Sequence, residues 1–169
     1  MSASRPAVII LAAGAGTRMN SALPKVLHPI CGRAMLDYVL AAARELDPSG
    51  IIVVVGHRRD QVISHLSEHA PDARVVVQDR QGGTGHAVRT VIEETGLATG
   101  TVVVTYGDGP VLCGQTLAAL VSLHSQRHAA ATALTTVMDD PTGYGRIIRD
   151  GEGALLGTVS YTHLTLPTN

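Results

Sequence analysis

Short runs rich in Val, Ile and Ala alternate along this chain with segments of helical periodicity, and this alternation restricts the possible folds more than any other feature. Strand–helix alternation is typical of right-handed βαβ units. It predicts an α/β fold, a Rossmann-like, mostly parallel sheet flanked by helices. The predicted strands are Ala7–Ala13, Ile51–Val55, Arg74–Gln78 and Thr101–Tyr106. The predicted helices contain the segments Leu36–Leu46, Val62–Leu66, Ala87–Ile92 and Leu117–Val121.

The C-terminal part of the chain has a different character. Thr132–Met138 is strand-like, and Arg146–Arg149 and Ala154–Thr158 flank Asp150-Gly151, which is a hairpin turn signal. The last ten residues, Ser160–Asn169, carry no charge and show no clear period. They follow a strand that should lead into more protein, so we expect the domain to be incomplete at its C-terminus.

Composition narrows the functional classes. The chain has 169 residues, enough for one domain, and because it lacks Phe and Trp its core must consist of Val, Ile, Leu and Ala, as suits a parallel sheet. A net charge of −1 and the scarcity of aromatic residues argue against a nucleic acid or an anionic membrane as partner. The sequence contains neither a membrane span of ~20 apolar residues nor a signal-peptide pattern, so we expect a cytoplasmic protein. Cys31 and Cys113 are isolated, and we expect reduced structural thiols.

The loop after the first predicted strand combines small residues with fixed positive charge. Gly14 and Gly16 let the backbone approach a ligand closely, and successive N–H groups can form an anion-binding nest. Arg18 and Lys25 follow, so the segment could cradle a triphosphate. It is neither a dinucleotide-binding fingerprint, because Met19 stands where the third Gly belongs, nor a Walker loop. Ligands of parallel sheets bind beyond the carboxyl ends of the strands, where this loop is expected.

Four segments carry motifs in a fixed order. They are L-x-x-G-x-G-T-R-M at Leu11–Met19 with the following P-K-V-L, Q-x-x-Q-x-G-T-G-H-A at Gln78–Ala87, G-D-x-P at Gly107–Pro110, and D-D-P-x-G-Y-G-R at Asp139–Arg146. In this order and spacing they resemble the sugar-phosphate nucleotidyltransferases, in particular the uridyltransferase domain of the bifunctional N-acetylglucosamine-1-phosphate uridyltransferase/glucosamine-1-phosphate acetyltransferases. The resemblance covers about residues 7–159 and implies a fold of the nucleotide-diphospho-sugar transferase type.

The resemblance also implies a role for each matched residue. Arg18 and Lys25 would be catalytic and stabilise charge on the departing pyrophosphate. Asp108 would hold Mg²⁺. Tyr106, Gly107 and Gly145 would contact the sugar. The nucleotide would be bound by Leu11, Ala12, Ala13, Gly14, Gly16, Gln78, Gly83 and Thr84, with Gln78 pairing with the uracil edge.

The implied reaction is attack by the phosphate oxygen of N-acetylglucosamine 1-phosphate on the α-phosphate of UTP. UDP-N-acetylglucosamine and pyrophosphate would leave. Such a transfer needs positioning and charge neutralisation more than acid–base chemistry. The parent enzyme would be a homo-oligomer assembled through an acetyltransferase β-helix domain that is absent from this sequence.

Three departures from the family pattern bear on activity. Ala15 stands where many relatives have Lys, Gly109 replaces a larger residue, and Ser160 stands where the pattern has Glu. Since the pattern fails at Ser160, we expect residues 5–159 to be a partial nucleotidyltransferase domain and residues 160–169 to be a non-native tail, so that activity is impaired. Two alternatives stay open: a nucleotidyltransferase for another sugar or cofactor, such as a guanylyltransferase, and a non-catalytic nucleotide-binding fragment.

Several histidines could be mistaken for metal ligands. His65 and His69, like His124 and His128, are four residues apart, a spacing that can bind metal on a helix. The sequence places no acidic partner or third ligand beside either pair, so we expect solvated helix faces. His86 should open a helix and form a hydrogen bond there, without acting as an acid or base.

Overall fold

The computed structural model describes residues 5–16, 19–97, 99–153 and 155–159. The chain divides into two compact units, residues 1–132 and residues 133–169, which are treated separately below. None of the helices in the described part of the chain has the length and apolar character that a bilayer crossing requires.

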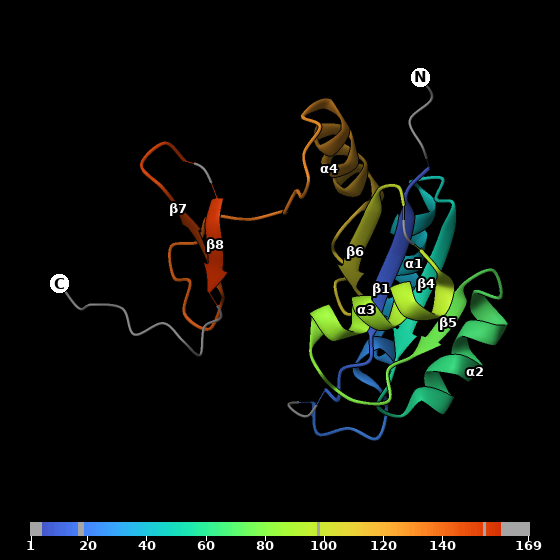
Figure 1. The fold of residues 1–169 in the computed structure, drawn as a ribbon. Coiled ribbons are helices and arrows are strands. Elements are labelled where there is room, and N and C mark those ends of the chain that lie inside the picture. Colours follow the sequence, from blue (N-terminus) through green and yellow to red (C-terminus); the bar gives the residue numbers. More distant parts are fainter. Residues whose placement is uncertain (1–4, 17–18, 98, 154, 160–169) are drawn as a thin grey trace. The chain divides into compact units, whose positions relative to one another are not determined.

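A four-stranded parallel sheet organises the first unit (Figure 1). Its strands run in the order β5 (Arg74–Val77), β4 (Gly50–Val55), β1 (Ala7–Ala12) and β6 (Val102–Tyr106). β1 lies in the middle, where its residues are paired with β4 on one side and β6 on the other. All four predicted strands are confirmed. β1 and β4 are buried on both faces and therefore read as continuous apolar runs, whereas β6 leaves Val102 and Val104 partly exposed on one face.

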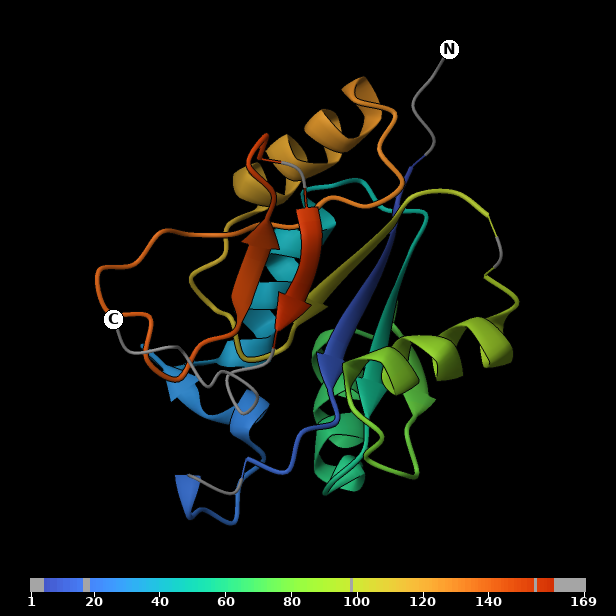
Figure 2. The same ribbon diagram turned by 60° about the vertical axis from the view of Figure 1, so that its left-hand side comes forward.

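Helices cover both faces of this sheet, as the α/β prediction requires (Figures 1 and 2). On one face α1 (Met35–Arg44), α2 (Arg59–His69) and α4 (Gly114–Gln126) pack on alternate strand residues such as Val8 and Ile10. On the other face α3 (Thr84–Thr95) packs on Ile9 and Val54 through Ala87 and Val91. All four predicted helices are confirmed, and α3 ends at Gly96, whose φ of 69° is the left-handed conformation that glycine favours.

Short elements connect β1 to α1. A 3₁₀ turn, η2 (Lys25–Leu27), leads into an antiparallel pair, β2 (Pro29–Ile30) and β3 (Arg33–Ala34). Cys31 lies in the turn of that hairpin, and both it and Cys113 are free and exposed. The thiols are therefore unpaired, as expected, but neither contributes to the core.

The second unit contains the predicted hairpin, β7 (Arg146–Arg149) paired antiparallel with β8 (Leu155–Val159). The strand predicted at Thr132–Met138 is wrong, because that segment is irregular. Leu134 is 55% exposed and Val137 is 99% exposed, and no described strand pairs with the segment. An alternating pattern forms a strand only where a neighbour completes its hydrogen bonds. The tail at residues 160–169 lies outside the described residues, so its predicted non-native character stays a prediction.

Candidate active site

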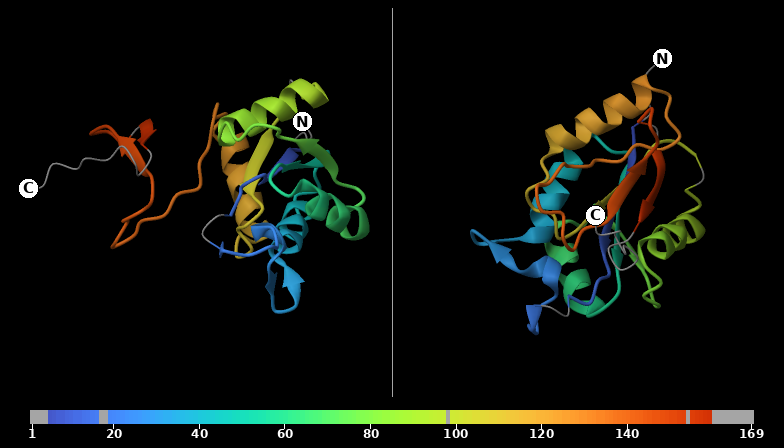
Figure 3. Two further views of the ribbon diagram at one scale, coloured as in Figure 1. Left: turned by 90° about the horizontal axis from the view of Figure 1, so that it is seen from below. Right: turned by 90° about the vertical axis from the view of Figure 1, so that its left-hand side faces the viewer.

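A cavity of about 720 Å³ opens at the carboxyl edge of the sheet, within the range of small-molecule sites. Figure 3, left, looks towards this edge from below the view of Figure 1. The loops that follow β1, β5 and β6 supply most of its wall. Of the residues predicted to form the site, those lining the cavity are Leu11, Ala12, Ala13, Gly14, Gly16, Lys25, Gln78, Gly83, Thr84, Tyr106 and Asp108.

Two glycines let the strand ends approach each other closely enough to build this wall. A Cβ on Gly56, which follows β4, would lie 2.9 Å from the Cβ of Ala13 and 3.2 Å from the carbonyl oxygen of Gln78. A Cβ on Gly107, which follows β6, would lie 3.2 Å from Cγ1 of Val26. Gly107 donates its N–H to the carbonyl of Leu11 at 2.9 Å. Gly107, which was predicted to contact the sugar, is therefore packed against Val26 and does not line the cavity.

The loop Ala13–Gly16, which was predicted to bind phosphates, is held against Lys25 and against the loop after β5. Gly16 has φ 60°, and a Cβ there would lie 3.0 Å from the Cβ of Lys25. Gln81 donates from Nε2 to the carbonyl oxygen of Ala13 at 3.2 Å and lines the cavity. No role was predicted for Gln81, although it is the second Gln of the Q-x-x-Q-x-G-T-G-H-A motif.

Gln78 follows β5 and is 5% exposed. Its backbone N–H donates to the carbonyl of Val55 at 2.8 Å, which extends the ladder between β4 and β5 by one residue. Its side-chain Nε2 lies 3.1 Å from the carbonyl oxygen of Gly83 and 2.8 Å from Nδ1 of His86. The prediction that His86 forms a hydrogen bond at the start of a helix is confirmed.

Lys25 and Asp108 both line the cavity and form an ion pair, with 2.6 Å between Nζ and Oδ2. Their side chains are 42% and 32% exposed, so solvent screens this ion pair. Lys25 is the only lysine of the chain. In this arrangement the ammonium group neutralises the carboxylate that was predicted to hold a metal ion.

The chemistry of Asp108 fits Mg²⁺, which is commonly held by one or two carboxylates together with substrate phosphates. Within the described ranges there is no cluster of three or more His, Cys, Asp or Glu side chains able to hold a metal by themselves. A cation at this edge would thus depend on Asp108 and on the ligand.

Arg18, Gly145 and Gly109 are three further positions that the sequence motifs singled out. Arg18 lies outside the described residues. Gly145 belongs to the second unit, where a Cβ would lie 3.1 Å from the carbonyl oxygen of Val159, so its lack of a side chain also has a packing reason. Gly109 has only the carbonyl of Tyr106 near its Cβ position, at 3.6 Å, so the larger residue of relatives would fit here.

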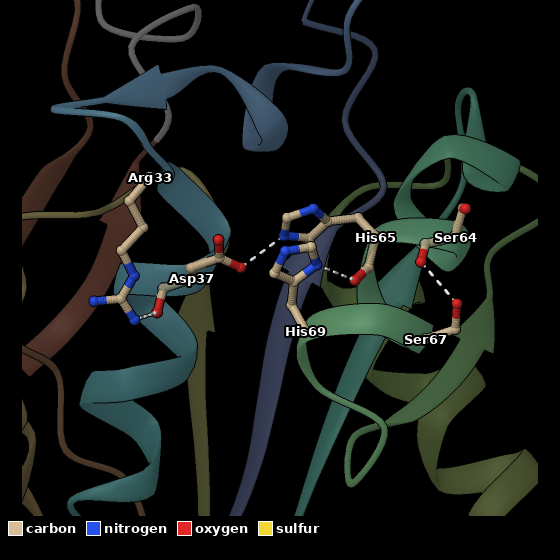
Figure 4. Close-up of polar contacts among 6 residues, drawn as sticks. All are labelled: Arg33, Asp37, Ser64, His65, Ser67 and His69. Atoms are coloured by element: carbon tan, nitrogen blue, oxygen red, sulfur yellow. Dashed lines mark hydrogen bonds and ion pairs between the residues drawn. The ribbon is translucent and has the colours of Figure 1, made fainter.

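The expectation for His65 is wrong, because an acidic partner is present. Its Nε2 lies 2.7 Å from Oδ1 of Asp37, and both side chains are largely buried, at 17% and 15% exposed (Figure 4). The ring of His69 stacks on that of His65 with 4.2 Å between centroids. Asp37 comes from α1, so the contact joins two helices and could not be seen in the periodicity of either. His124 Nδ1 lies 3.0 Å from Oγ1 of Thr132, while His128 is exposed.

Comparisons with known proteins agree with this geometry. Residues 8–162 match the MobA-like NTP transferase domain family. The chain is 56% identical over 164 residues to the bifunctional protein GlmU of Streptomyces avermitilis and 54% identical over 170 residues to that of Thermobifida fusca. These matches cover 95% and 98% of the chain but only 34% and 35% of the relatives, so the chain spans about a third of their length.

Solved structures of low sequence identity share the fold. UDP-glucose pyrophosphorylase from Acinetobacter baumanii superposes with a TM-score of 0.69 at 21% identity, covering 93% of this chain and 68% of that one. HddC from Yersinia pseudotuberculosis, complexed with GMP-PN, gives a TM-score of 0.68 at 20% identity, covering 92% and 69%. With the matched family segment, the parallel sheet and the cavity at its carboxyl edge, the chain belongs to the MobA-like NTP transferase domain family of nucleotidyltransferases.

Proposed function

We propose that this chain is the nucleotide-binding part of an enzyme that transfers the uridylyl group of UTP to N-acetylglucosamine 1-phosphate. The observation that carries the proposal is the convergence of the Ala13–Gly16 backbone, Gln78 and Asp108 on one cavity. The backbone loop that would bind phosphates, the amide that would pair with the base and a carboxylate thus lie at one edge of the sheet. The similarity to GlmU proteins supports the choice of substrates.

In this proposal the residues of the chain act mainly by position and charge. The loop Ala13–Gly16 would bind the phosphates through its backbone, and Gln78 with Gly83 and Thr84 would hold the uracil. Lys25 would leave Asp108 and neutralise the triphosphate. A phosphate oxygen of the sugar phosphate would attack the α-phosphorus, and the bond to the β-phosphate would break with its electrons leaving on pyrophosphate. Arg18 would share the stabilisation of that charge.

The divalent cation and the sugar complete the proposed site. Asp108 would hold Mg²⁺, which when bound supplies further positive charge beside the phosphates. Tyr106 lines the cavity and would contact the sugar. Gly107 and Gly145 stay predicted sugar contacts. Acetyl transfer, homo-oligomerisation and a cytoplasmic location would belong to the longer protein, and these stay predictions.

Two measurements on the chain test the proposal: calorimetry with UTP or GTP in the presence of Mg²⁺, and release of pyrophosphate on adding N-acetylglucosamine 1-phosphate. We expect UTP to bind more tightly than GTP, and Gln78→Ala to weaken UTP binding by about 1–3 kcal/mol, the cost of an unpaired buried polar group. Tighter GTP binding would favour a guanylyltransferase. UTP binding without pyrophosphate release would favour a non-catalytic nucleotide-binding fragment, and binding of neither nucleotide would contradict the proposal.

A further inference from the structure

We infer that His86 is a positioning residue: it fixes the orientation of the Gln78 side-chain amide and so makes the site prefer uracil to cytosine. This inference rests on the proposed function, because it assigns Gln78 to the base. His86 itself does not line the cavity, so it would act through Gln78 and not on the ligand.

The orientation of the Gln78 amide follows from its partners. The carbonyl oxygen of Gly83 can only accept, so the amide atom 3.1 Å away must be the NH₂ nitrogen. That same nitrogen lies 2.8 Å from Nδ1 of His86, and its second proton is directed there. Nδ1 must therefore be the unprotonated acceptor of a neutral ring, with the ring proton on Nε2.

Both amide protons of Gln78 are thus used inside the protein, and only the amide oxygen is left for a ligand. That oxygen accepts no hydrogen bond from the described residues, and Gln78 lines the cavity. An amide oxygen can pair with the N3–H of uracil. It would face the N3 lone pair of cytosine, which is a second acceptor, so the same contact becomes repulsive.

His86 matters because it opposes a flip of the amide. Turning Gln78 over would replace two hydrogen bonds by two acceptor–acceptor contacts, one with Gly83 and one with His86. Without His86 only the Gly83 carbonyl would resist the flip. The flipped amide would offer its NH₂ to the cavity and accommodate cytosine.

The backbone and the ring of His86 each have a close neighbour. It lies in the first turn of α3, and its backbone carbonyl accepts from Oγ1 of Thr90 at 2.9 Å. The ring covers Gly82 so closely that a Cβ there would lie 2.8 Å from the ring carbon Cγ. The Q-x-x-Q-x-G-T-G-H-A segment therefore forms a unit in which Gly82 makes room for His86 and His86 orients Gln78.

The test compares UTP and CTP binding in four proteins: the unchanged chain, His86→Ala, His86→Asn and the exposed control His128→Ala. Loss of one hydrogen bond should reduce the preference for UTP over CTP by about two- to tenfold in His86→Ala. His86→Asn should restore the preference, because its amide oxygen can accept in place of Nδ1. His128→Ala should leave the preference unchanged. Circular dichroism checks that each variant is folded.

A ratio that stays the same in His86→Ala overturns the positioning role, since a merely structural histidine would weaken both nucleotides equally. Failure of His86→Asn to restore the ratio does the same. Nuclear magnetic resonance of the nucleotide-free chain gives an independent readout. Both side-chain amide protons of Gln78 should exchange slowly, and one should become fast in His86→Ala. If neither nucleotide binds, the proposed function fails, and the amide exchange still decides whether His86 orients Gln78.

Discussion

Single side chains decide how this cavity can meet a ligand, because most of its wall is backbone and small apolar residues. Several of its polar groups already have partners: Lys25 pairs with Asp108, Gln81 with Ala13, and the amide nitrogen of Gln78 with two acceptors. Binding a charged nucleotide therefore exchanges internal contacts for contacts with the ligand. Before a ligand binds, the internal contacts satisfy these polar groups and pair the charges of Lys25 and Asp108. When a ligand binds, the same charges become available to it.

Away from the cavity, the ion pair between Arg44 and Asp72 makes a testable contribution to stability. The hydrogen bond from Arg44 holds the pKa of Asp72 below its ordinary value. Because the pKa is lower in the folded chain, the pair stabilises the fold above the pKa of the unfolded chain, and this contribution is lost as the pH falls through the folded value. The two side chains are 41% and 56% exposed, so Asp72→Asn should cost only about 0.2–1 kcal/mol at neutral pH.

Urea unfolding of Asp72→Asn, Arg44→Gln and the double variant measures this coupling. The difference between the unchanged chain and Asp72→Asn should vanish once the pH is below the aspartate range. Additive effects of the two single variants at neutral pH would show that the pair contributes nothing.

Site residues that belong to a sequence motif could be predicted from the sequence. Contacts between residues that are far apart in the sequence could not. Gln78 ends one predicted strand and Asp108 comes two residues after another, so their place at the carboxyl edge could be foreseen. The partner of His65 could not, because Asp37 precedes it by 28 residues and meets it only after α1 and α2 have packed. The pairing of Lys25 with Asp108 likewise depends on how β1 and β6 lie side by side.

At the scale of elements, the geometry of the site depends on how closely the ends of β1, β4 and β5 approach. At Gly56 two neighbouring segments lie close by: the position that a Cβ would occupy is 2.9 Å from the Cβ of Ala13 and 3.2 Å from the carbonyl oxygen of Gln78. A side chain here would push the Ala13–Gly16 loop and Gln78 apart. Gly56 thus shapes the site by its small size, although it contributes no functional group to it.

We therefore expect Gly56→Ala to destabilise the fold by about 1–3 kcal/mol, as overpacking does, and to weaken UTP binding as well. Gly50→Ala, at the other end of β4, is the matched control, since nothing lies within 4 Å of its Cβ position. It should change stability by no more than about 0.5 kcal/mol. Urea unfolding and calorimetry measure both effects. Equal stability of the two variants would contradict the close approach at Gly56.

Strands could be predicted from the sequence where burial beneath helices produced a run of apolar residues. The runs Ile51–Val55 and Arg74–Gln78 became strands because each lies against a neighbouring strand and beneath helices. Thr132–Met138 has the same kind of residues but neither a strand partner among the described residues nor cover for its apolar side chains. Composition alone could not distinguish the two cases, because the difference lies in tertiary neighbours.

At the scale of the whole molecule, every residue lining the cavity lies in the first unit, between Leu11 and Asp108. Residues 128–145 have no helix or strand and are mostly exposed, so this segment is the expected site of proteolytic cleavage. The proposed sugar contact at Gly145 belongs to the other unit. Nucleotide binding should therefore be separable from binding of the sugar phosphate.

Limited digestion with a protease of broad specificity should produce a fragment that ends between residues 128 and 145. Its affinity for UTP, measured by calorimetry, should match that of the undigested chain within about twofold. Pyrophosphate release, where the undigested chain shows it, should be lost. A fragment that no longer binds UTP would show that the second unit contributes to the nucleotide site.

Lys25, which pairs with Asp108, can be labelled selectively. As the sole lysine, Lys25 carries the only side-chain amine, so an amine-selective acylating reagent forms stable amides only at this residue and at the N-terminus. Its Nζ is partly exposed at the cavity, and bound phosphates would cover it. Mass spectrometry should therefore find acylation of Lys25 slowed by any nucleotide that occupies the site, with the N-terminus as internal standard. Unchanged labelling at saturating UTP would place the phosphates elsewhere, whereas protection would turn one amine into a direct reporter of which ligands enter.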